Sequence, residues 1–170
     1  MERLHYEAVV PQMLKQIKAG AFLCAQAGDD VNVMTIGWAS FGFIWGKPVM
    51  TIAVRPTRYT FGIIERARDF TVTVPSVSMK KELECCGSES GRNCDKLKKC
   101  NLELFPSIKV RTPILSVPGI HFECVIACKS TINPKSLIEE YAPIYPQKDY
   151  HTLYHGEIKE CYSTADERMT

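Results

Sequence analysis

The sequence predicts a mainly β protein with short helices, arranged as an antiparallel barrel. Segments with the alternation or β-branched content of strands outnumber the helical segments, and each helical segment is short. Successive strand segments are joined mostly by turns, whereas a doubly wound sheet needs a regular crossover helix between strands. The length of 170 residues is enough for one hydrophobic core, so we expect a single domain over residues 1–170.

The first part of the chain predicts one helix and three strands. In residues 10–20, Pro11 is placed to open a short helix and Gly20 to end it. Residues 21–41 predict a β-hairpin whose turn is the sequence "GDD". Residues 47–56 are rich in Val, Thr and Ile and end in a proline, which predicts the next strand.

Two further short helices flank a strand in the middle of the chain. Residues 57–69 predict a helix because apolar residues recur every third position, and Thr57 or Thr60 can cap its free amides. Residues 70–76 alternate as a strand does, and residues 77–87 predict a second short helix that a glycine ends.

The last part of the chain is dominated by two long strands. Residues 88–109 have no sustained period and are expected to be irregular. Residues 121–132 and 151–163 predict the long strands, and residues 164–170 are expected to be frayed.

Charge and hydropathy exclude several classes of function. The net charge of +2 gives no basic field that would favour nucleic acid. No apolar run approaches the roughly 20 residues needed to span a bilayer, and the amino terminus lacks the apolar stretch of a signal peptide. We therefore expect a soluble cytoplasmic protein with no membrane or nucleic-acid partner.

The chain has eight cysteines, and with no secretion signal we expect free thiols rather than disulfides. Four of them cluster, at Cys85, Cys86, Cys94 and Cys100. Their spacing matches neither a structural zinc site nor a common iron–sulfur site, so we expect no metal there, although Cys85 or Cys94 could respond to oxidants. Cys124 and Cys128 lie four apart in a strand pattern, so we expect both to face the core.

A candidate phosphate site follows the strand over residues 47–56. Arg55, Thr57, Arg58 and Thr60 surround the start of the next helix, where amides, hydroxyls and guanidinium groups can bind an anion. The alternative is an ordinary threonine cap flanked by solvated arginines. The stretch "NVMTIGWAS" favours the phosphate site, because Asn32, Thr35 and Trp38 could supply hydrogen bonds and an aromatic face to the rest of a ligand.

Several ordered motifs resemble the flavin reductase-like, FMN-binding split-barrel family, and within it the flavoredoxin group. They are "NVMTIGWAS", "PVMTIAVRPTRYT", "DFTVTVP", "CGSESGRNCDK" and "HTLYHGEI". The resemblance implies an antiparallel split β-barrel of Greek-key type that forms a homodimer, with FMN near the subunit interface.

The resemblance also implies a set of cofactor-binding residues. Those on the ring side are Asn32, Val33, Met34, Thr35 and Trp38. Those at the ribityl phosphate are Arg55, Thr57, Arg58, Tyr59 and Thr60. A loop of Ser90, Gly91 and Arg92 lies beside them, and Lys96 reaches the flavin. A late histidine also approaches the flavin in this family, and the candidates are His151 and His155, which share one face of their segment.

The function implied is an oxidoreductase in which FMN accepts a hydride from NADH or NADPH and passes electrons to a small-molecule or protein acceptor. No catalytic residue is assigned beyond the flavin, except as a role for His151 or His155. One alternative is a flavoredoxin-like electron carrier that a partner protein reduces. Another is a metal or thiol sensor that uses the cysteine cluster.

Overall fold

The structure, a computed structural model, describes residues 1–165. Its main sheet has the strand order β3-β2-β6-β9-β10-β5-β4, and β1 pairs with β10 outside this order. The strands of this sheet are β1 (Glu2–Arg3), β2 (Ala21–Ala27), β3 (Asp30–Ile36), β4 (Ala39–Ile44), β5 (Lys47–Val54), β6 (Asp69–Pro75), β9 (Gly119–Thr131) and β10 (Thr152–Thr164). A separate pair is formed by β7 (Leu104–Phe105) and β8 (Ile114–Leu115). Every strand pair is antiparallel, which confirms the predicted architecture.

The helices are short, as expected. The α-helices are α1 (Tyr6–Gln16), α2 (Tyr59–Ile64), α3 (Lys80–Ser88) and α4 (Lys96–Lys99). The 3-10 helices are η1 (Ile17–Ala19), η2 (Pro134–Ser136) and η3 (Glu139–Ile144). No helix within residues 1–165 is long and apolar enough to cross a membrane.

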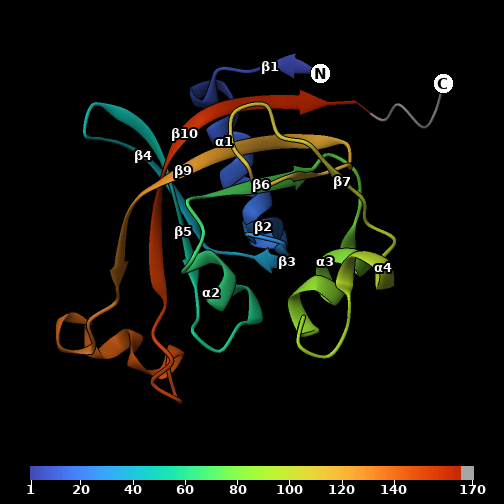
Figure 1. Ribbon diagram of the computed structural model, residues 1–170. Coiled ribbons are helices and arrows are strands. Elements are labelled where there is room, and N and C mark those ends of the chain that lie inside the picture. The colour runs from blue at the N-terminus through green and yellow to red at the C-terminus, as the bar shows by residue number, and fades with distance from the viewer. Residues whose placement is uncertain (166–170) are drawn as a thin grey trace.

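The curled sheet is split between β3 and β4 (Figure 1). These two strands are the ends of the strand order, yet only Gly37 and Trp38 separate them in the chain. No ladder joins β3 to β4, so the barrel is not closed and β3 keeps one edge without a neighbouring strand.

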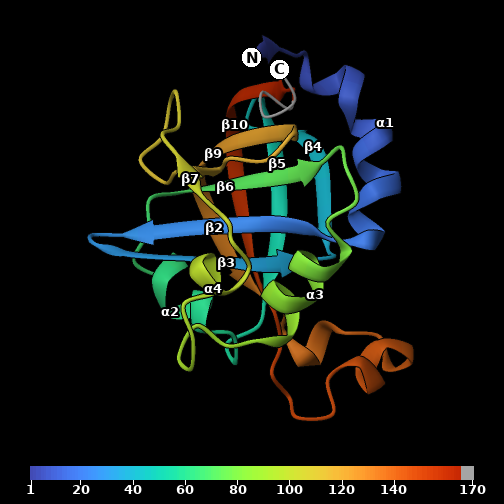
Figure 2. The ribbon, with the colours of Figure 1, turned by 90° about the vertical axis from the view of Figure 1, so that its right-hand side faces the viewer.

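Two hydrophobic clusters stabilise the barrel. The larger one fills its interior, with Phe70, Phe122 and Tyr154 among its fully buried side chains. The smaller one lies between the sheet and the helices α3 and α4, where Phe22 and Val33 pack with residues of those helices and their flanks. Figure 2 shows α2, α3 and α4 gathered beside β3 at one end of the barrel, and α1 along another side.

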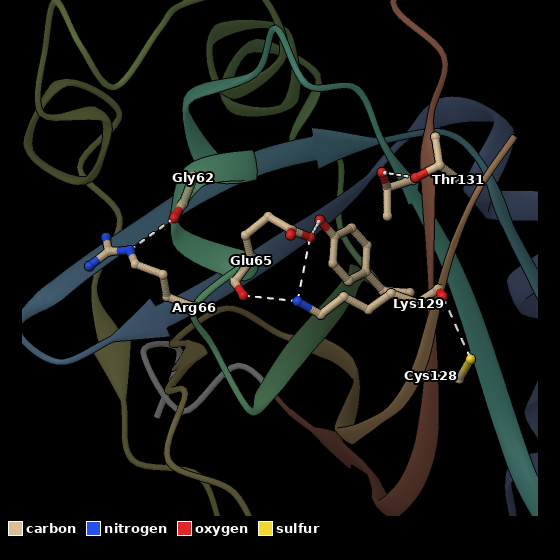
Figure 3. A network of polar contacts seen from close by, with 8 residues as sticks. Gly62, Glu65, Arg66, Cys128, Lys129 and Thr131 are labelled. Carbon is tan, nitrogen blue, oxygen red and sulfur yellow. Dashed lines mark hydrogen bonds and ion pairs between the residues drawn. The ribbon is translucent and has the colours of Figure 1, made fainter.

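A polar network ties the end of α2 to the long strands (Figure 3). The Tyr154 hydroxyl donates to Glu65 Oε1 at 2.6 Å, and Lys129 Nζ donates to the Glu65 backbone oxygen at 2.9 Å. Arg66 Nε donates to the Gly62 carbonyl at 3.0 Å within the same turn. The network fixes α2 on β9 and β10, and thereby the residues at its other end.

The first helix begins earlier than the sequence predicts. It starts at Tyr6, so that Pro11 lies inside it rather than at its opening. An internal proline removes one backbone hydrogen bond and costs about 3 kcal/mol. Burial of Val9 and Met13 against the barrel, about 1.5–3 kcal/mol each, offsets that cost.

The predicted hairpin over residues 21–41 is confirmed as far as Ile36 and is wrong only for its last five residues, 37–41. The hairpin of β2 and β3 ends at Ile36, and the following residues form β4, which pairs with β5 instead. The expected threonine caps of α2 are also wrong, because Arg58 is the N-cap residue and no side chain caps the helix.

Two other boundaries differ from the predictions. The helix α3 runs through Gly87, where an added Cβ would lie 3.4 Å from Thr35 Cβ, so this glycine allows close packing on β3 rather than ending the helix. The segment expected to be irregular contains α4 and β7. Thr164, predicted to be frayed, closes β10 and hydrogen-bonds His121, while residues 166–170 lie outside the described residues.

The prediction that Cys124 and Cys128 face the core together is wrong for Cys128. Cys124 is buried and Cys128 is exposed. The register of β9 against β10 shifts between His155, paired with Cys128, and Gly156, paired with Ile126. The extra residue of this β-bulge reverses the side of the sheet that the following side chains face, so Cys128 does not face the core with Cys124.

Candidate functional site

A cleft of about 260 Å³ lies where the barrel is split. Its walls come from the end of β3, the link to β4, the end of β5, the start of α2 and the residue before β10. It is lined by Met34, Thr35, Ile36, Gly37, Trp38, Ala53, Arg55, Arg58 and His151. The structure therefore brings together the two stretches that the sequence analysis singled out.

The open edge of β3 forms one wall. Because β3 pairs only with β2, its outer backbone N–H and C=O groups have no strand to bond. Met34 is buried toward the barrel interior, and Thr35 Oγ1 donates to the Leu83 carbonyl of α3 at 2.5 Å. The Val33 side chain packs in the cluster beneath α3, so it does not line the cleft.

Trp38 and His151 form an aromatic wall. Trp38 remains 45% exposed, and its ring centroid lies 4.5 Å from that of His151. His151 Nδ1 is 2.8 Å from the Tyr145 hydroxyl. Burial, with the nearby positive charge of Arg55, lowers the pKa of His151 to about 4, and burial raises the pKa of Tyr145. Both rings are therefore neutral near pH 7.

Arg55 is held by the segment that precedes β10. Its Nη1 donates to both carboxylate oxygens of Asp149, at 2.7 and 2.9 Å, and its Nη2 donates to the Ile144 carbonyl at 3.0 Å. The hydrogen bond from Arg55 lowers the pKa of Asp149. The charge of this arginine is thus already paired, which weakens its predicted role in binding a phosphate.

Arg58 and Lys96 form a second, unpaired group of cations. Lys96 is 3% exposed, and its Nζ donates to the Cys86 carbonyl at 3.1 Å. Arg58 Nη2 reaches the same carbonyl at 3.4 Å. Burial lowers the pKa of both groups, and the charge of Arg58 lowers that of Lys96 further.

Neither cation has a carboxylate partner within residues 1–165. Two positive charges that share one neutral carbonyl repel each other, and Lys96, which is buried, and Arg58, which is half-buried, have each lost part of their hydration. An anion bound beside them would remove both costs. Arg58 lines the cleft, whereas Lys96 lies behind the Cys86 carbonyl that both bond and does not line it. A phosphate beside Arg58 would offset the positive charge of this pair.

Two of the predicted polar residues, Asn32 and Thr60, bond to each other and do not line the cleft. Asn32 Nδ2 donates to Thr60 Oγ1 at 2.7 Å in a buried position, so β3 is linked to α2. An added Cβ on Gly91 would lie 2.3 Å from the Tyr59 ring and 2.7 Å from Asn32 Oδ1. The loop of residues 90–92 therefore packs on the start of α2, and only glycine fits at this contact.

The rest of that loop is held locally. Arg92 Nη1 donates to the Thr57 carbonyl at 3.2 Å, and its guanidinium lies 5.7 Å from the Tyr59 ring centroid. Ser90 Oγ accepts a hydrogen bond from the Arg92 amide at 3.3 Å. The exposed Thr57 does not line the cleft.

The two late histidines have different surroundings, although the sequence placed them on one face. His155 lies between Thr51 Oγ1, 2.9 Å from its Nδ1, and Ser130 Oγ, 3.0 Å from its Nε2, and it does not line the cleft. His151 does. Of the two candidates, the geometry favours His151.

The sequence analysis missed Tyr145 and Asp149 as residues that support the site. Both lie in a segment whose sequence has no regular period, so no pattern indicated that it returns to the cleft. Within residues 1–165, no group of three His, Cys, Asp or Glu side chains is arranged to hold a metal ion.

The fold and the cleft define the class: a split antiparallel β-barrel with a cleft beside its open strand edge. Residues 15–169 match the flavin reductase like domain family, and the chain belongs to that family. This confirms the resemblance found in the sequence.

Individual relatives are distant. An uncharacterised protein of Pyrococcus abyssi is 29% identical over 134 residues, which cover 77% of this chain and 65% of that protein. The structure of flavoredoxin from Methanosarcina acetivorans is 25% identical with a TM-score of 0.65, covering 85% of this chain and 68% of that one. An FMN-binding protein from Thermus thermophilus, with bound 1-cyclohex-2-enone, is 22% identical with a TM-score of 0.67, covering 85% and 69%. The chain thus spans about two thirds of the length of each of these proteins.

Proposed function

We propose that this protein binds FMN in the cleft and is an oxidoreductase that passes electrons from NADH or NADPH to an acceptor. The observation that carries the proposal is a pair of cations, the buried Lys96 and the half-buried Arg58, which share the Cys86 carbonyl and have no carboxylate partner within residues 1–165. A phosphate monoester would supply the missing negative charge. Membership of the flavin reductase like family, and an FMN-binding protein among the structural neighbours, favour FMN over other phosphates.

The shape of the site also suits a flavin. The open edge of β3 offers backbone donors and acceptors to the polar edge of a ring, and Trp38 adds an aromatic surface. The cleft is slightly smaller than the roughly 300–1,000 Å³ of typical ligand sites. It is extended at Trp38 by an adjoining apolar hollow of about 470 Å³, which shares Gly37, Trp38 and Ala53 with it.

The chain's own residues would orient the ligand and control its protons. Bound FMN supplies the hydride and electron chemistry. Arg58 and Lys96 hold the phosphate, and Asn32 bonded to Thr60 keeps β3 and α2 at a fixed separation. When the Tyr145 hydroxyl donates to His151 Nδ1, the neutral imidazole carries its proton at Nε2, so that His151, which lines the cleft, has one ring N–H to donate.

An anaerobic reduction experiment tests the reaction. The purified protein with FMN is mixed with NADH or NADPH, and the flavin absorbance is followed in a stopped-flow instrument. Rapid bleaching by either nicotinamide supports the reductase. An NADH:FAD oxidoreductase of Streptomyces globisporus among the structural neighbours makes this the first assay to perform.

The second candidate function is an electron carrier that a partner protein reduces. The likeness to flavoredoxin from Methanosarcina acetivorans favours it. No bleaching by either nicotinamide, together with full reduction by dithionite, would support the carrier and contradict the reductase.

We also propose that the protein is a homodimer with FMN near the interface. The terminal strand β4 and the following turn expose Phe43, Ile44 and Trp45. The start of the same strand, at Ala39 and Ser40, lines the apolar hollow beside Trp38. Sedimentation velocity on the protein and on Phe43→Glu tests the dimer, which the charged variant should weaken. The cytoplasmic location and the identity of the acceptor stay predictions.

A further inference from the structure

The apolar hollow of about 470 Å³ adjoins the cleft at Trp38. The two share Gly37, Trp38 and Ala53. The other walls of the hollow come from α1, η1, the start of β4, β5 and β10. A molecule in the hollow would therefore lie next to a flavin bound in the cleft.

The side chains that line the hollow are mostly apolar. They include Leu14, Ile17 and Leu153. Within residues 1–165, Lys18 is the only charged residue that lines the hollow, and because it is exposed its ammonium can stay in water. Moving a charged ligand from water into apolar surroundings costs free energy. The hollow therefore suits an uncharged ring compound better than a ferric ion or a flavin that carries a phosphate.

Two hydroxyl groups interrupt the apolar lining. Ser40 and Thr51 both line the hollow, and they are directly paired between β4 and β5. Side chains of directly paired residues leave the sheet on the same face, with Cβ atoms about 4.5–5.5 Å apart. Two neighbouring hydroxyls can donate hydrogen bonds to a carbonyl oxygen. An uncharged ring compound that carries a carbonyl group is therefore favoured over a hydrocarbon.

A chain of hydrogen bonds leads from Thr51 to the surface. Thr51 Oγ1 lies 2.9 Å from His155 Nδ1, and His155 Nε2 lies 3.0 Å from Ser130 Oγ. His155 is half-buried and Ser130 is exposed. When His155 carries its proton at Nδ1, it donates to Thr51 and accepts from Ser130. The hydroxyl proton of Thr51 is then available to a ligand, and the chain connects it to water at Ser130.

We propose that the hollow binds a quinone as the electron acceptor, that Thr51 donates to a quinone oxygen, and that His155 is a positioning residue behind Thr51. The proposal rests on the proposed function, because FMN reduced by NADH or NADPH supplies the electrons. A quinone is uncharged, carries the carbonyl oxygens that the two hydroxyls can bond, and needs only electrons and protons for its reduction.

The reduction balances with the groups in place. The quinone takes two electrons and one proton from the reduced flavin and a second proton through Thr51, and it becomes a hydroquinone. His155 returns a proton to Thr51 and regains one from water through Ser130. The sum oxidises one NADH or NADPH, consumes one proton and reduces one quinone to its hydroquinone.

Binding is tested first, and it does not depend on the reaction. The purified full chain, with FMN and without it, is titrated calorimetrically with duroquinone, whose fully substituted ring does not add to free thiols such as Cys128. We expect saturable binding that Leu14→Glu, at a position 46% exposed, weakens by about tenfold. Gln12→Glu is the matched control, because it adds the same charge at an exposed position of α1 that does not line the hollow, and it should keep the duroquinone Kd. No saturable binding, or equal weakening by both variants, would overturn the proposal.

The role of the hydroxyl is tested on the reduced protein. FMN bound to the protein is reduced with one equivalent of dithionite and mixed anaerobically with duroquinone, and the return of the flavin absorbance is followed. We expect Thr51→Val to slow this return by about a hundredfold, the loss of one positioned proton donor, and Thr51→Ser to restore it. His155→Phe should also slow it, and the double variant with Thr51→Val should be no slower than Thr51→Val alone, because His155 acts through Thr51.

The outcomes separate this proposal from the proposed function. An unchanged rate in Thr51→Val, or losses that add in the double variant, would overturn the roles of Thr51 and His155. Flavin that neither nicotinamide reduces, but that duroquinone reoxidises after dithionite, would contradict the reductase and support the acceptor site.

Discussion

Replacing Lys96 by methionine separates a ligand-binding role from a structural one. Methionine keeps most of the length and apolar stem of the lysine but removes its charge. Lys96 is 3% exposed, and its ammonium donates one hydrogen bond, to the Cys86 carbonyl at 3.1 Å. Burial, and then the positive charge of Arg58, lower the pKa of Lys96.

The expected changes in affinity and stability differ in size. A charge-assisted hydrogen bond to phosphate contributes about 1.5–3 kcal/mol, so Lys96→Met should weaken the FMN Kd by about 10- to 150-fold. In the free protein, loss of the bond to Cys86 is offset by removal of a desolvated and repelled charge. The free energy of unfolding without ligand should therefore change by less than about 1 kcal/mol.

The assay is a fluorescence titration of FMN, paired with urea unfolding of the ligand-free protein. Lys99→Met is the matched control, because Lys99 lies on the same helix but is exposed and pairs with Glu89. The control should keep the FMN Kd of the unchanged protein. If Lys96→Met binds FMN normally and loses several kcal/mol of stability, Lys96 is a structural residue and the reasoning is refuted.

Three further changes test other parts of the site and fold. Trp38→Ala should shift the absorption spectrum and midpoint potential of bound FMN with little loss of stability, because the side chain is 45% exposed; an identical spectrum and potential would mean that Trp38 does not meet the ring. Thr60→Val should lower the free energy of unfolding by about 1–3 kcal/mol, since it leaves the buried Asn32 amide without its acceptor at 2.7 Å; unchanged urea unfolding would contradict that account. Burial lowers the pKa of His121 to about 4, so between that value and about pH 6.5 the unfolded chain binds more protons than the folded protein. The free energy of unfolding should therefore keep the whole contribution of His121 above pH 6.5 and lose it as the pH falls toward 4. His121→Asn should show a shallower fall in urea unfolding across that range, and an equal slope in both proteins would show that His121 is not the cause.

Local patterns in the sequence predicted the strands well. The segments over residues 70–76 and 151–163 alternate or are β-branched, and they form β6 and β10. The predictions were wrong where contacts between distant segments decide the outcome. Pro11 lies inside a helix because Val9 and Met13 pack on the barrel, and Cys128 is exposed because β9 has a bulge that depends on its pairing with β10. Neither partner can be recognised from the local pattern.

The site was predictable as a set of motifs but not as a set of contacts. The sequence correctly suggested that the residues around Trp38 and Arg58 lie together, because each stretch has polar groups where a core strand would be apolar. It did not show that Arg55 pairs with Asp149, which lies 94 positions further along the chain. It also gave no sign that Arg58 and Lys96 share one carbonyl, since the acceptor is a backbone group that carries no residue-type signal.

A comparison of FMN with riboflavin tests the central claim most directly. The two flavins share the same ring and ribityl chain, and only FMN carries the phosphate that Arg58 and Lys96 are proposed to bind. Fluorescence titration of the reduced-thiol protein should give an FMN Kd at least about tenfold tighter than that of riboflavin, with the difference reduced in Lys96→Met. Equal affinity for the two flavins, or no binding of either, would contradict the account.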